Sequence, residues 1–323
     1  MQNLSNCPVC DASTFQKEFT STDYTVTKEK FNIVSCTNCN FFFTNPRPEQ
    51  SAIGKYYESE DYISHSNAKK GIINSIYQFV RSYSLSKKVN LINLLSKAEN
   101  KAENKAESKS ESKSGINSGS SSGSKKGEIL DIGSGTGEFL AKAVENGWSG
   151  IGVEPNMKAR AQAIANHNLN IYTEEDVHSL KKSHFDVITM WHVLEHVHSL
   201  NERVEEIFNL LKPGGISIIA VPNHLSYDAQ KYKEDWAAYD VPRHLYHFDP
   251  NSIKKLFKKH NFSHVQSFPM KFDSFYVSML SEKNIAGKNQ FLNSFITGGI
   301  SNLKTKNNPE KYSSVIYVFK KPD

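Results

Sequence analysis

The sequence predicts an α/β fold with a doubly wound, mostly parallel sheet, preceded by a small cysteine-bearing module and a helical region. Apolar segments at 128–132, 149–154, 185–190 and 215–221 are short enough for buried strands and alternate with helical segments. A glycine-rich turn directly follows the first of these segments, and four cysteines lie near the N-terminus. With 323 residues, the chain can form one substantial core and a minor domain.

Residues 1–46 are predicted to form a zinc ribbon. The chain's four cysteines form two Cys-x-x-Cys pairs: Cys7, Cys10, Cys36 and Cys39. Four thiolates suit the tetrahedral geometry of Zn²⁺ and leave no open position, so we expect the metal to be structural. Asp11 and Asn40 follow the two pairs, and both tolerate the left-handed backbone that such turns often need. Redox-active dithiols are the alternative, but neither pair lies in a βαβ context.

Two segments separate this module from the α/β domain, which we expect at 127–323. Residues 47–96 are predicted to be a helical cap region, because apolar side chains recur there at helical spacing from Ile72 to Leu95. Residues 97–126 are of low complexity. Lysine and glutamate each recur there every four residues, so every i,i+4 charge pair is like-signed, and a Gly/Ser-rich tail follows. We expect a flexible insert.

The charge distribution argues against a nucleic-acid partner. The net charge is +5, but the insert alone carries seven lysines and four glutamates, which leaves 32 basic and 30 acidic residues elsewhere. Such a weak excess is not the footprint of a nucleic-acid binder. No segment approaches the roughly 20 apolar residues that span a bilayer, and no signal peptide is visible. We therefore expect a cytoplasmic protein without a membrane partner.

The glycine-rich turn Gly133-Ser134-Gly135-Thr136-Gly137 is the strongest sign of a ligand site. Glycines between a buried strand and a helix let a ligand approach the backbone closely. The dinucleotide fingerprint G-x-G-x-x-G is not met, because Glu138 occupies the position of its last glycine. An acidic residue at this helix start also suits a pyrophosphate poorly. A sulfonium cofactor with an amino-acid tail has no phosphate and fits better.

With Asp131 ahead of the glycines, this segment resembles the first motif of the class I S-adenosylmethionine-dependent methyltransferases. Three further motifs of that family follow in order: Val153-Glu154-Pro155, the segment 185–196, and Leu210–Gly215. The resemblance covers 127–223 and implies a seven-stranded Rossmann-like sheet with S-adenosylmethionine as cofactor. It implies that Glu154 holds the ribose and that Asp176 lies near the adenine. The full set of expected cofactor-binding residues is Asp131, Gly133, Gly135, Gly137, Glu154, Asp176 and His192.

The candidate catalytic residues come mainly from the segment 239–248, which we call the acceptor loop. The whole chain resembles the ubiquinone-biosynthesis O-methyltransferases, and its cysteine module resembles that of the deoxysugar C-methyltransferases. His244 matches the histidine base in the Tyr-x-Glu-His-Leu-x-Tyr-Phe segment of the second family, whereas Arg243 and His247 depart from it and Tyr239 lies two residues too far upstream. The resemblance implies that His244 is the base, and we expect Arg243 to hold an anionic group of the acceptor.

A second cluster follows the segment 185–190. His192 and His196 are four residues apart and share a face if this turn is helical, a spacing that could ligate a metal together with Glu195. The alternative is that His196 packs structurally and His192 lines the cofactor site. His196 and Tyr239 therefore join His244 as catalytic candidates.

These observations predict methyl transfer to oxygen or carbon of a small-molecule acceptor, sugar- or quinone-like. One alternative is an RNA or protein methyltransferase that uses the ribbon to bind a macromolecule, which the weak charge excess disfavours. Another is a non-catalytic module that only binds S-adenosylmethionine, which the complete motif set disfavours.

Overall fold

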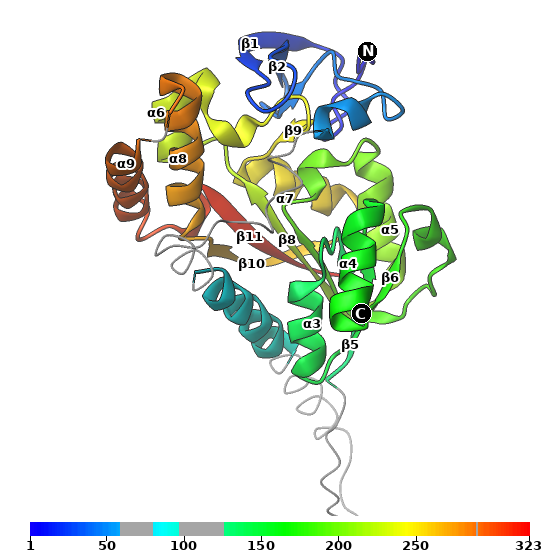
Figure 1. Cartoon of the computed structure of the whole chain (residues 1–323). Coiled ribbons are helices and arrows are strands. Elements are labelled where there is room, and N and C mark those ends of the chain that lie inside the picture. The colour runs from blue at the N-terminus through cyan, green and yellow to red at the C-terminus, as the bar shows by residue number, and fades with distance from the viewer. Residues whose placement is uncertain (59–79, 97–125, 289) are drawn as a thin grey trace, which may run out of the picture. The chain divides into compact units, whose positions relative to one another are not determined.

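The computed structural model describes residues 1–58, 80–96, 126–288 and 290–323 (Figure 1). The chain divides into two compact units. Unit 1 comprises Met1–Lys69, Met190–Phe208 and Ser217–Asp323, and unit 2 comprises Lys70–Thr189 and Asn209–Ile216. The predicted insert, except Lys126, and the apolar run from Ile72 to Phe79 lie outside the described residues, while residues 80–96 are helical. Within the described residues, no helix combines the length and apolarity needed to cross a membrane.

The larger sheet has seven strands in the order β10-β11-β8-β7-β4-β5-β6. Strands β4, β5 and β6 pair in parallel, and β10 pairs antiparallel with β11, which confirms the predicted fold class. The strands are β4 (Glu128–Ile132), β5 (Ser149–Val153), β6 (Asn170–Tyr172), β7 (Phe185–Trp191), β8 (Leu211–Pro222), β10 (Ser263–Pro269) and β11 (Ser314–Lys320). The segment Lys212–Gly215 ends the preceding helix as expected, but it continues directly as the first part of β8.

Local sequence signals begin the helices that flank this sheet. Asp249 caps α7 by accepting hydrogen bonds from the backbone N–H of Asn251 and Ser252, with Pro250 in the first turn. Asn156 caps α4 in the same way. The helices are α3 (Glu138–Glu145), α4 (Met157–His167), α5 (Leu200–Leu210), α6 (Tyr227–Tyr232), α7 (Pro250–Lys259), α8 (Asp273–Ala286) and α9 (Phe291–Lys304). Short 3₁₀ segments include η1 (Ile53–Tyr57), η3 (Glu175–Ser179), η4 (Leu194–His196), η5 (Lys233–Asp235), η6 (Ala237–Tyr239) and η7 (Pro309–Lys311).

A second, four-stranded sheet in unit 1 joins the N-terminal module to the acceptor loop. Its order is β1-β2-β3-β9, and its strands are β1 (Phe15–Thr22), β2 (Lys30–Cys36), β3 (Phe42–Thr44) and β9 (Tyr246–His247). Strand β9 belongs to the acceptor loop and pairs antiparallel with β3, Phe42 opposite His247 and Phe43 opposite Tyr246. The ring of Phe41 packs against those of Tyr246 and Phe248, with centroids 5.9 and 5.5 Å away. The cysteine module and the loop that carries His244 therefore share one sheet and one aromatic core.

Candidate functional site

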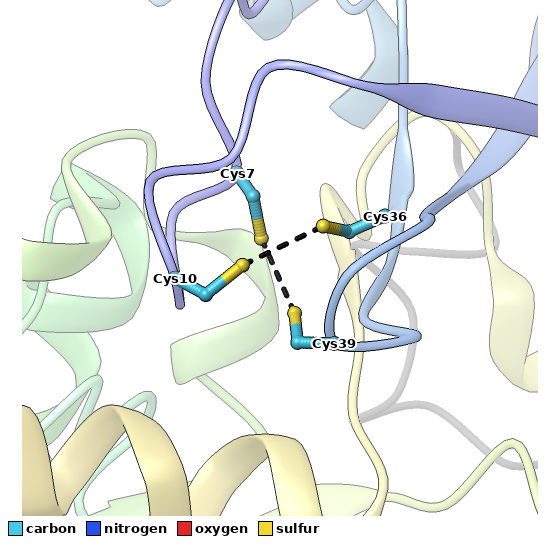
Figure 2. A group of neighbouring side chains, drawn as sticks. All are labelled: Cys7, Cys10, Cys36 and Cys39. Carbon is cyan, nitrogen blue, oxygen red and sulfur yellow. Dashed lines mark hydrogen bonds between the residues drawn. The ribbon is translucent and has the colours of Figure 1, made fainter.

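The four cysteines point toward one another in the N-terminal module (Figure 2). The Sγ atoms of Cys7 and Cys39 are 3.6 Å apart, and those of Cys10 and Cys36 are 3.5 Å apart. A tetrahedral site with Zn–S bonds of about 2.3 Å has sulfurs about 3.8 Å apart, so the four thiols fit a zinc ion with little adjustment. All four cysteines are free of disulfides.

The two Cys-x-x-Cys turns have the same backbone pattern. The N–H of Asp11 donates to the carbonyl of Cys7 at 2.9 Å, and the N–H of Asn40 donates to the carbonyl of Cys36 at 2.8 Å. Both turns need a left-handed residue at this position, with φ of 61° at Asp11 and 58° at Asn40. The expected left-handed backbone at both residues is therefore confirmed, and the turns hold the thiols together from both sides.

In unit 2, the glycine-rich turn and Glu154 form one connected structure. The N–H of Gly135 donates to Glu154 Oε2 at 2.8 Å, and the N–H of Asn156 donates to Glu154 Oε1 at 2.8 Å. Gly135 has φ of 57°, and a Cβ atom placed on it would meet no heavy atom within 4 Å. The hydroxyl of Ser134 is buried without a hydrogen-bond partner in the described residues. An open backbone turn beside a buried carboxylate fits a cofactor with ribose hydroxyls and an amino-acid tail.

Three further residues expected at the cofactor site, Gly137, Asp131 and Asp176, each have a defined local environment. Gly137 has φ of 86° and begins α3, and a Cβ atom there would lie 2.9 Å from Ala163 Cβ of α4. Asp131 is buried and accepts a hydrogen bond from Thr189 Oγ1 at 2.6 Å. Burial raises the pKa of Asp131 to about 7, although the Thr189 hydroxyl opposes the shift. Asp176 accepts from the N–H and the hydroxyl of Thr173 at 2.9 and 2.8 Å.

His192 lies in unit 1 at the end of β7 and pairs with two carboxylates. Its Nε2 lies 3.0 Å from Asp273 Oδ2, and its Nδ1 lies 3.5 Å from Glu195 Oε1. Burial alone would lower the pKa of His192, but Asp273 and Glu195 outweigh burial and raise the pKa to about 9. His192 is therefore protonated at neutral pH, which makes it a poor metal ligand.

The helical turn on which a joint metal site of His192 and His196 depended is not formed. His192 has a left-handed backbone with φ of 57°, and the turn at 194–196 is a short 3₁₀ segment. The two rings therefore do not share a helix face. His196 instead directs its ring edge-on to that of His244, with centroids 4.5 Å apart.

Glu195, His196 and His244 form the cluster that could hold a cation. One ligand atom from each lies within 4.8 Å of the others. Glu195 is fully buried, and neither of its carboxylate oxygens accepts a hydrogen bond from the part of the chain that the structure describes. Burial and the nearby His244 lower the pKa of His196 to about 4, so its imidazole is neutral. A buried carboxylate beside two imidazoles can hold either a proton or a divalent metal ion.

The hydrogen bonds of His244 define its tautomer. Its Nδ1 lies 2.8 Å from the carbonyl of Ala238, which can only accept, so Nδ1 carries the proton. In the neutral ring Nε2 is then left with a free lone pair. The backbone of His244 is also fixed, because its N–H donates to the Asp240 carbonyl at 3.0 Å and its own carbonyl accepts from Thr44 Oγ1 at 3.0 Å.

Arg243 does not face an acceptor, which corrects the sequence expectation. Its guanidinium is 1% exposed and donates to both carboxylate oxygens of Asp240 at 2.9 and 2.6 Å, to Asp23 Oδ1 at 3.0 Å and to the Tyr56 carbonyl at 2.8 Å. Its positive charge is thus paired with carboxylates of the fold and not with an acceptor. Arg243 connects the acceptor loop to the N-terminal module and to η1.

Tyr239 is buried among aromatic rings rather than paired with a base. Its ring centroid lies 5.0 Å from that of Phe19, 5.1 Å from Trp236 and 5.1 Å from His247. Burial raises the pKa of Tyr239, and the carboxylates of Glu18 and Glu234 add to the shift. The phenol therefore stays protonated at neutral pH, and a catalytic role as a donor stays a prediction.

Three residues at this cluster were not singled out from sequence. Asp273, which opens α8, binds His192, and the hydroxyl of Tyr57 lies 3.0 Å from His196 Nδ1. Thr44 at the end of β3 holds the backbone of His244. Tyr57 belongs to the tyrosine pair that follows the Asn-Pro-Arg-Pro turn in the sequence. That pair is the sequence feature that could have indicated Tyr57. Asp273 and Thr44 lie in no motif, so only the fold reveals them.

Comparison with known proteins identifies one family. A family model described as a methyltransferase domain matches residues 97–267, which is more than half of the chain. The sequence matches none of the curated proteins that were searched.

Solved structures of low sequence identity share part of the fold. A phosphoethanolamine N-methyltransferase 2 of Haemonchus contortus in complex with S-adenosylmethionine is 19% identical over 61% of this chain and 49% of its own length, with a TM-score of 0.43. The match thus spans about half of that protein. A Thermotoga maritima methyltransferase described as a possible histamine N-methyltransferase is 18% identical to this chain. The match covers 60% of this chain and 82% of the other, with a TM-score of 0.42. A methyltransferase of Mesorhizobium loti is 16% identical to this chain. The match covers 60% of this chain and 91% of the other, with a TM-score of 0.41.

Proposed function

The chain belongs to the S-adenosylmethionine-dependent methyltransferases, and on that premise we propose that it methylates oxygen or carbon of a small-molecule acceptor, sugar- or quinone-like. The observation that carries this proposal is the orientation of the His244 ring, whose Nδ1 donates to the Ala238 carbonyl and whose Nε2 is therefore the nitrogen available as a base, near the buried Glu195 carboxylate. A hydroxyl or an acidic carbon must lose a proton when it accepts a methyl group. A base beside a buried carboxylate supplies that function.

The cofactor is assigned to the glycine-rich turn of unit 2. Glu154 would accept hydrogen bonds from the two ribose hydroxyls. The methionine portion of the cofactor would lie along the backbone at Gly133 and Gly135. Asp131, in β4 just before the turn, accepts a hydrogen bond from Thr189 of β7. When bound, S-adenosylmethionine supplies a methyl carbon already activated by the sulfonium.

The acceptor chemistry is assigned to the cluster in unit 1. His244 Nε2 would take the proton from the acceptor oxygen or carbon that receives the methyl group. The products are the methylated acceptor, S-adenosylhomocysteine and a protonated His244. Glu195 would stabilise the imidazolium, because its buried carboxylate lies in the same cluster as His244 and its Oε1 has only a long contact, 3.5 Å, with His192 Nδ1.

A structural zinc ion is part of the proposal. The four thiols would bind it and fix β2 and β3, and β3 in turn carries β9 and the hydrogen bond from Thr44 to His244. The ribbon would therefore support the acceptor loop rather than bind a macromolecule. This arrangement and the weak charge excess favour a small acceptor over RNA or protein.

The experiment that tests this proposal follows a labelled methyl group. The purified chain is incubated with isotopically labelled S-adenosylmethionine and three separate pools: a metabolite extract, RNA and denatured protein. Label should enter the metabolite pool, and product masses should rise by one methyl group. Label in the RNA or protein pool alone would reject a small acceptor. A matched reaction with His244→Ala gives the background.

A further inference from the structure

Helix α9 has its apolar side chains on the outside. Its large exposed side chains are Phe291, Leu292, Phe295, Ile296 and Leu303. At 100° per residue these five lie within one arc of about 140°, so they form a continuous apolar stripe. Leu292 is 75% exposed and Phe295 is 68% exposed. An apolar stripe of this kind would ordinarily face the core, so its exposure calls for a partner.

The opposite face of α9 explains why the large apolar side chains lie on the outside. It is formed by small residues, which are all buried: Ser294, Thr297, Gly298 and Ser301. Helices α8 and α9 lie side by side in unit 1 (Figure 1). A Cβ atom on Gly298 would lie 2.9 Å from the Cα of Phe275, so the two helices approach closely only because the residue is glycine. Small residues at such an interface and large apolar ones outside are typical of helices that contact lipid.

The charges around the stripe are basic. Five exposed lysines lie on α8, on α9 and next to their ends: Lys271, Lys283, Lys288, Lys304 and Lys306. The same span has two carboxylates, and each has a partner inside unit 1. Asp273 binds His192, and Glu282 accepts a hydrogen bond from the Tyr232 hydroxyl. The span 271–306 therefore carries a net positive charge, which is complementary to an anionic surface.

We propose that the apolar stripe of α9 binds the surface of an anionic lipid bilayer, with α9 lying in the plane of the headgroups. A helix of 14 residues is too short to span the roughly 20-residue thickness of the hydrocarbon core, but it suits an interfacial position. The phenyl, leucyl and isoleucyl side chains enter the boundary between headgroups and acyl chains. Lys288 before the helix and Lys306 after it bind lipid phosphates. This inference replaces the sequence expectation of no membrane partner and does not depend on the acceptor.

A second copy of the chain fits the surface less well. Two identical stripes facing each other would bring two basic spans together, and both carboxylates of the described part of the span already have partners inside unit 1. An anionic lipid surface removes that repulsion. The charge pattern therefore selects lipid over self-association.

The test is cosedimentation of the full chain with vesicles of phosphatidylcholine alone or mixed with phosphatidylglycerol. The wild type should sediment with the mixed vesicles and much less with phosphatidylcholine, and added salt should weaken binding. Leu292→Glu/Phe295→Glu should lower the affinity for mixed vesicles by about tenfold or more. Val265→Glu, which changes another exposed apolar side chain of unit 1, should bind as the wild type does.

A second variant tests the same contact without altering the stripe. Lys288→Glu/Lys306→Glu should lower binding to the mixed vesicles and remove most of its salt dependence. The proposal is overturned if the wild type binds neither vesicle, or if both double variants bind as it does. It is also overturned if the wild type is a dimer that Leu292→Glu/Phe295→Glu converts to a monomer, or if that variant's melting temperature collapses, since either result means that protein covers the stripe.

Discussion

Arg243 and Asp23 form a buried ion pair between segments 220 residues apart, with Arg243 Nη2 3.0 Å from Asp23 Oδ1. Asp23 is fully buried, and its oxygens also accept hydrogen bonds from the N–H groups of Thr25, Val26 and Thr27. Hydrogen bonds to these N–H groups and the Arg243 charge hold the pKa of Asp23 below its usual value, against the effect of burial. The pair ties the acceptor loop to the N-terminal module.

Removing the cation should therefore be costly. Arg243→Met leaves the buried carboxylate of Asp23 and the partly buried carboxylate of Asp240 without their cation, and the free energy of unfolding should fall by about 3–5 kcal/mol. Urea unfolding followed by circular dichroism measures the change. Lys259→Met is the control, because it breaks the exposed Lys259–Asp11 pair and should cost less than about 1 kcal/mol. Equal losses in the two variants would contradict a structural role for the buried pair.

The sequence predicted unit 2 better than unit 1. Local patterns of residue type and hydrophobic periodicity indicate the glycine-rich turn, Glu154 and the buried strands. These features could therefore be located in the sequence to within a few residues. Most contacts that build the histidine cluster connect segments far apart in sequence. Thr44 and His244 are 200 residues apart, and His192, at the end of β7, contacts Asp273 of α8, so no local pattern indicates either contact.

Arg243 and α9 show why side-chain roles are harder to predict than elements. An arginine next to a candidate base suggests an anion site, but buried carboxylates from two segments use its charge. The periodicity of α9 alone would place its apolar stripe in the core. Small residues on the other face decide the outcome, because they allow the closer helix–helix contact.

Zinc removal should affect the acceptor loop as well as the ribbon. One equivalent of zinc should copurify, and Cys36→Ser should lower the melting temperature and the rate of methyl transfer, because β2 and β3 carry β9. Elemental analysis and thermal unfolding give the two readouts. Ser35→Ala, beside the same cysteine, should keep the metal. Metal-free protein with full activity would exclude this role of the ribbon.

Glu154 should determine cofactor affinity. Glu154→Ala removes a charged acceptor and should weaken binding of S-adenosylmethionine by about tenfold or more, as measured by calorimetric titration. Glu145→Ala, an exposed carboxylate at the end of α3, is the control and should bind normally. S-adenosylmethionine should raise the melting temperature of the wild type, and NADH should not. Unchanged affinity in Glu154→Ala would remove this residue from the site.

His192 should make stability fall at alkaline pH. Its pKa of about 9 in the folded chain lies above the value of about 6.5 expected when unfolded. The folded state therefore binds the proton more tightly, and the stabilisation is complete below about pH 6.5 and lost as pH rises through about 9. Unfolding measured between these values should show this loss, and Asp273→Asn should flatten it. A wild type with the same pH profile as Asp273→Asn would contradict the pairing.

His244 is the residue on which the proposed chemistry depends. Its Nδ1 proton is held by the Ala238 carbonyl, so Nε2 is the available base, and His244→Ala should lower turnover by about a hundredfold or more. Affinity for S-adenosylmethionine should not change, because the residues assigned to the cofactor lie on the glycine-rich turn and β5. His244→Gln should recover little, since an amide cannot take the proton.

Two further variants separate proton transfer from the position of the loop. His167→Ala changes an exposed histidine at the end of α4 and is the control. Thr44→Val keeps the imidazole of His244 but removes the hydroxyl that holds its backbone, so it should lower turnover less than His244→Ala does. If His244→Ala keeps full turnover with a known acceptor, the base is another residue or none is needed. A turnover loss in Thr44→Val as large as that in His244→Ala would mean that loop position, rather than proton transfer, limits the reaction.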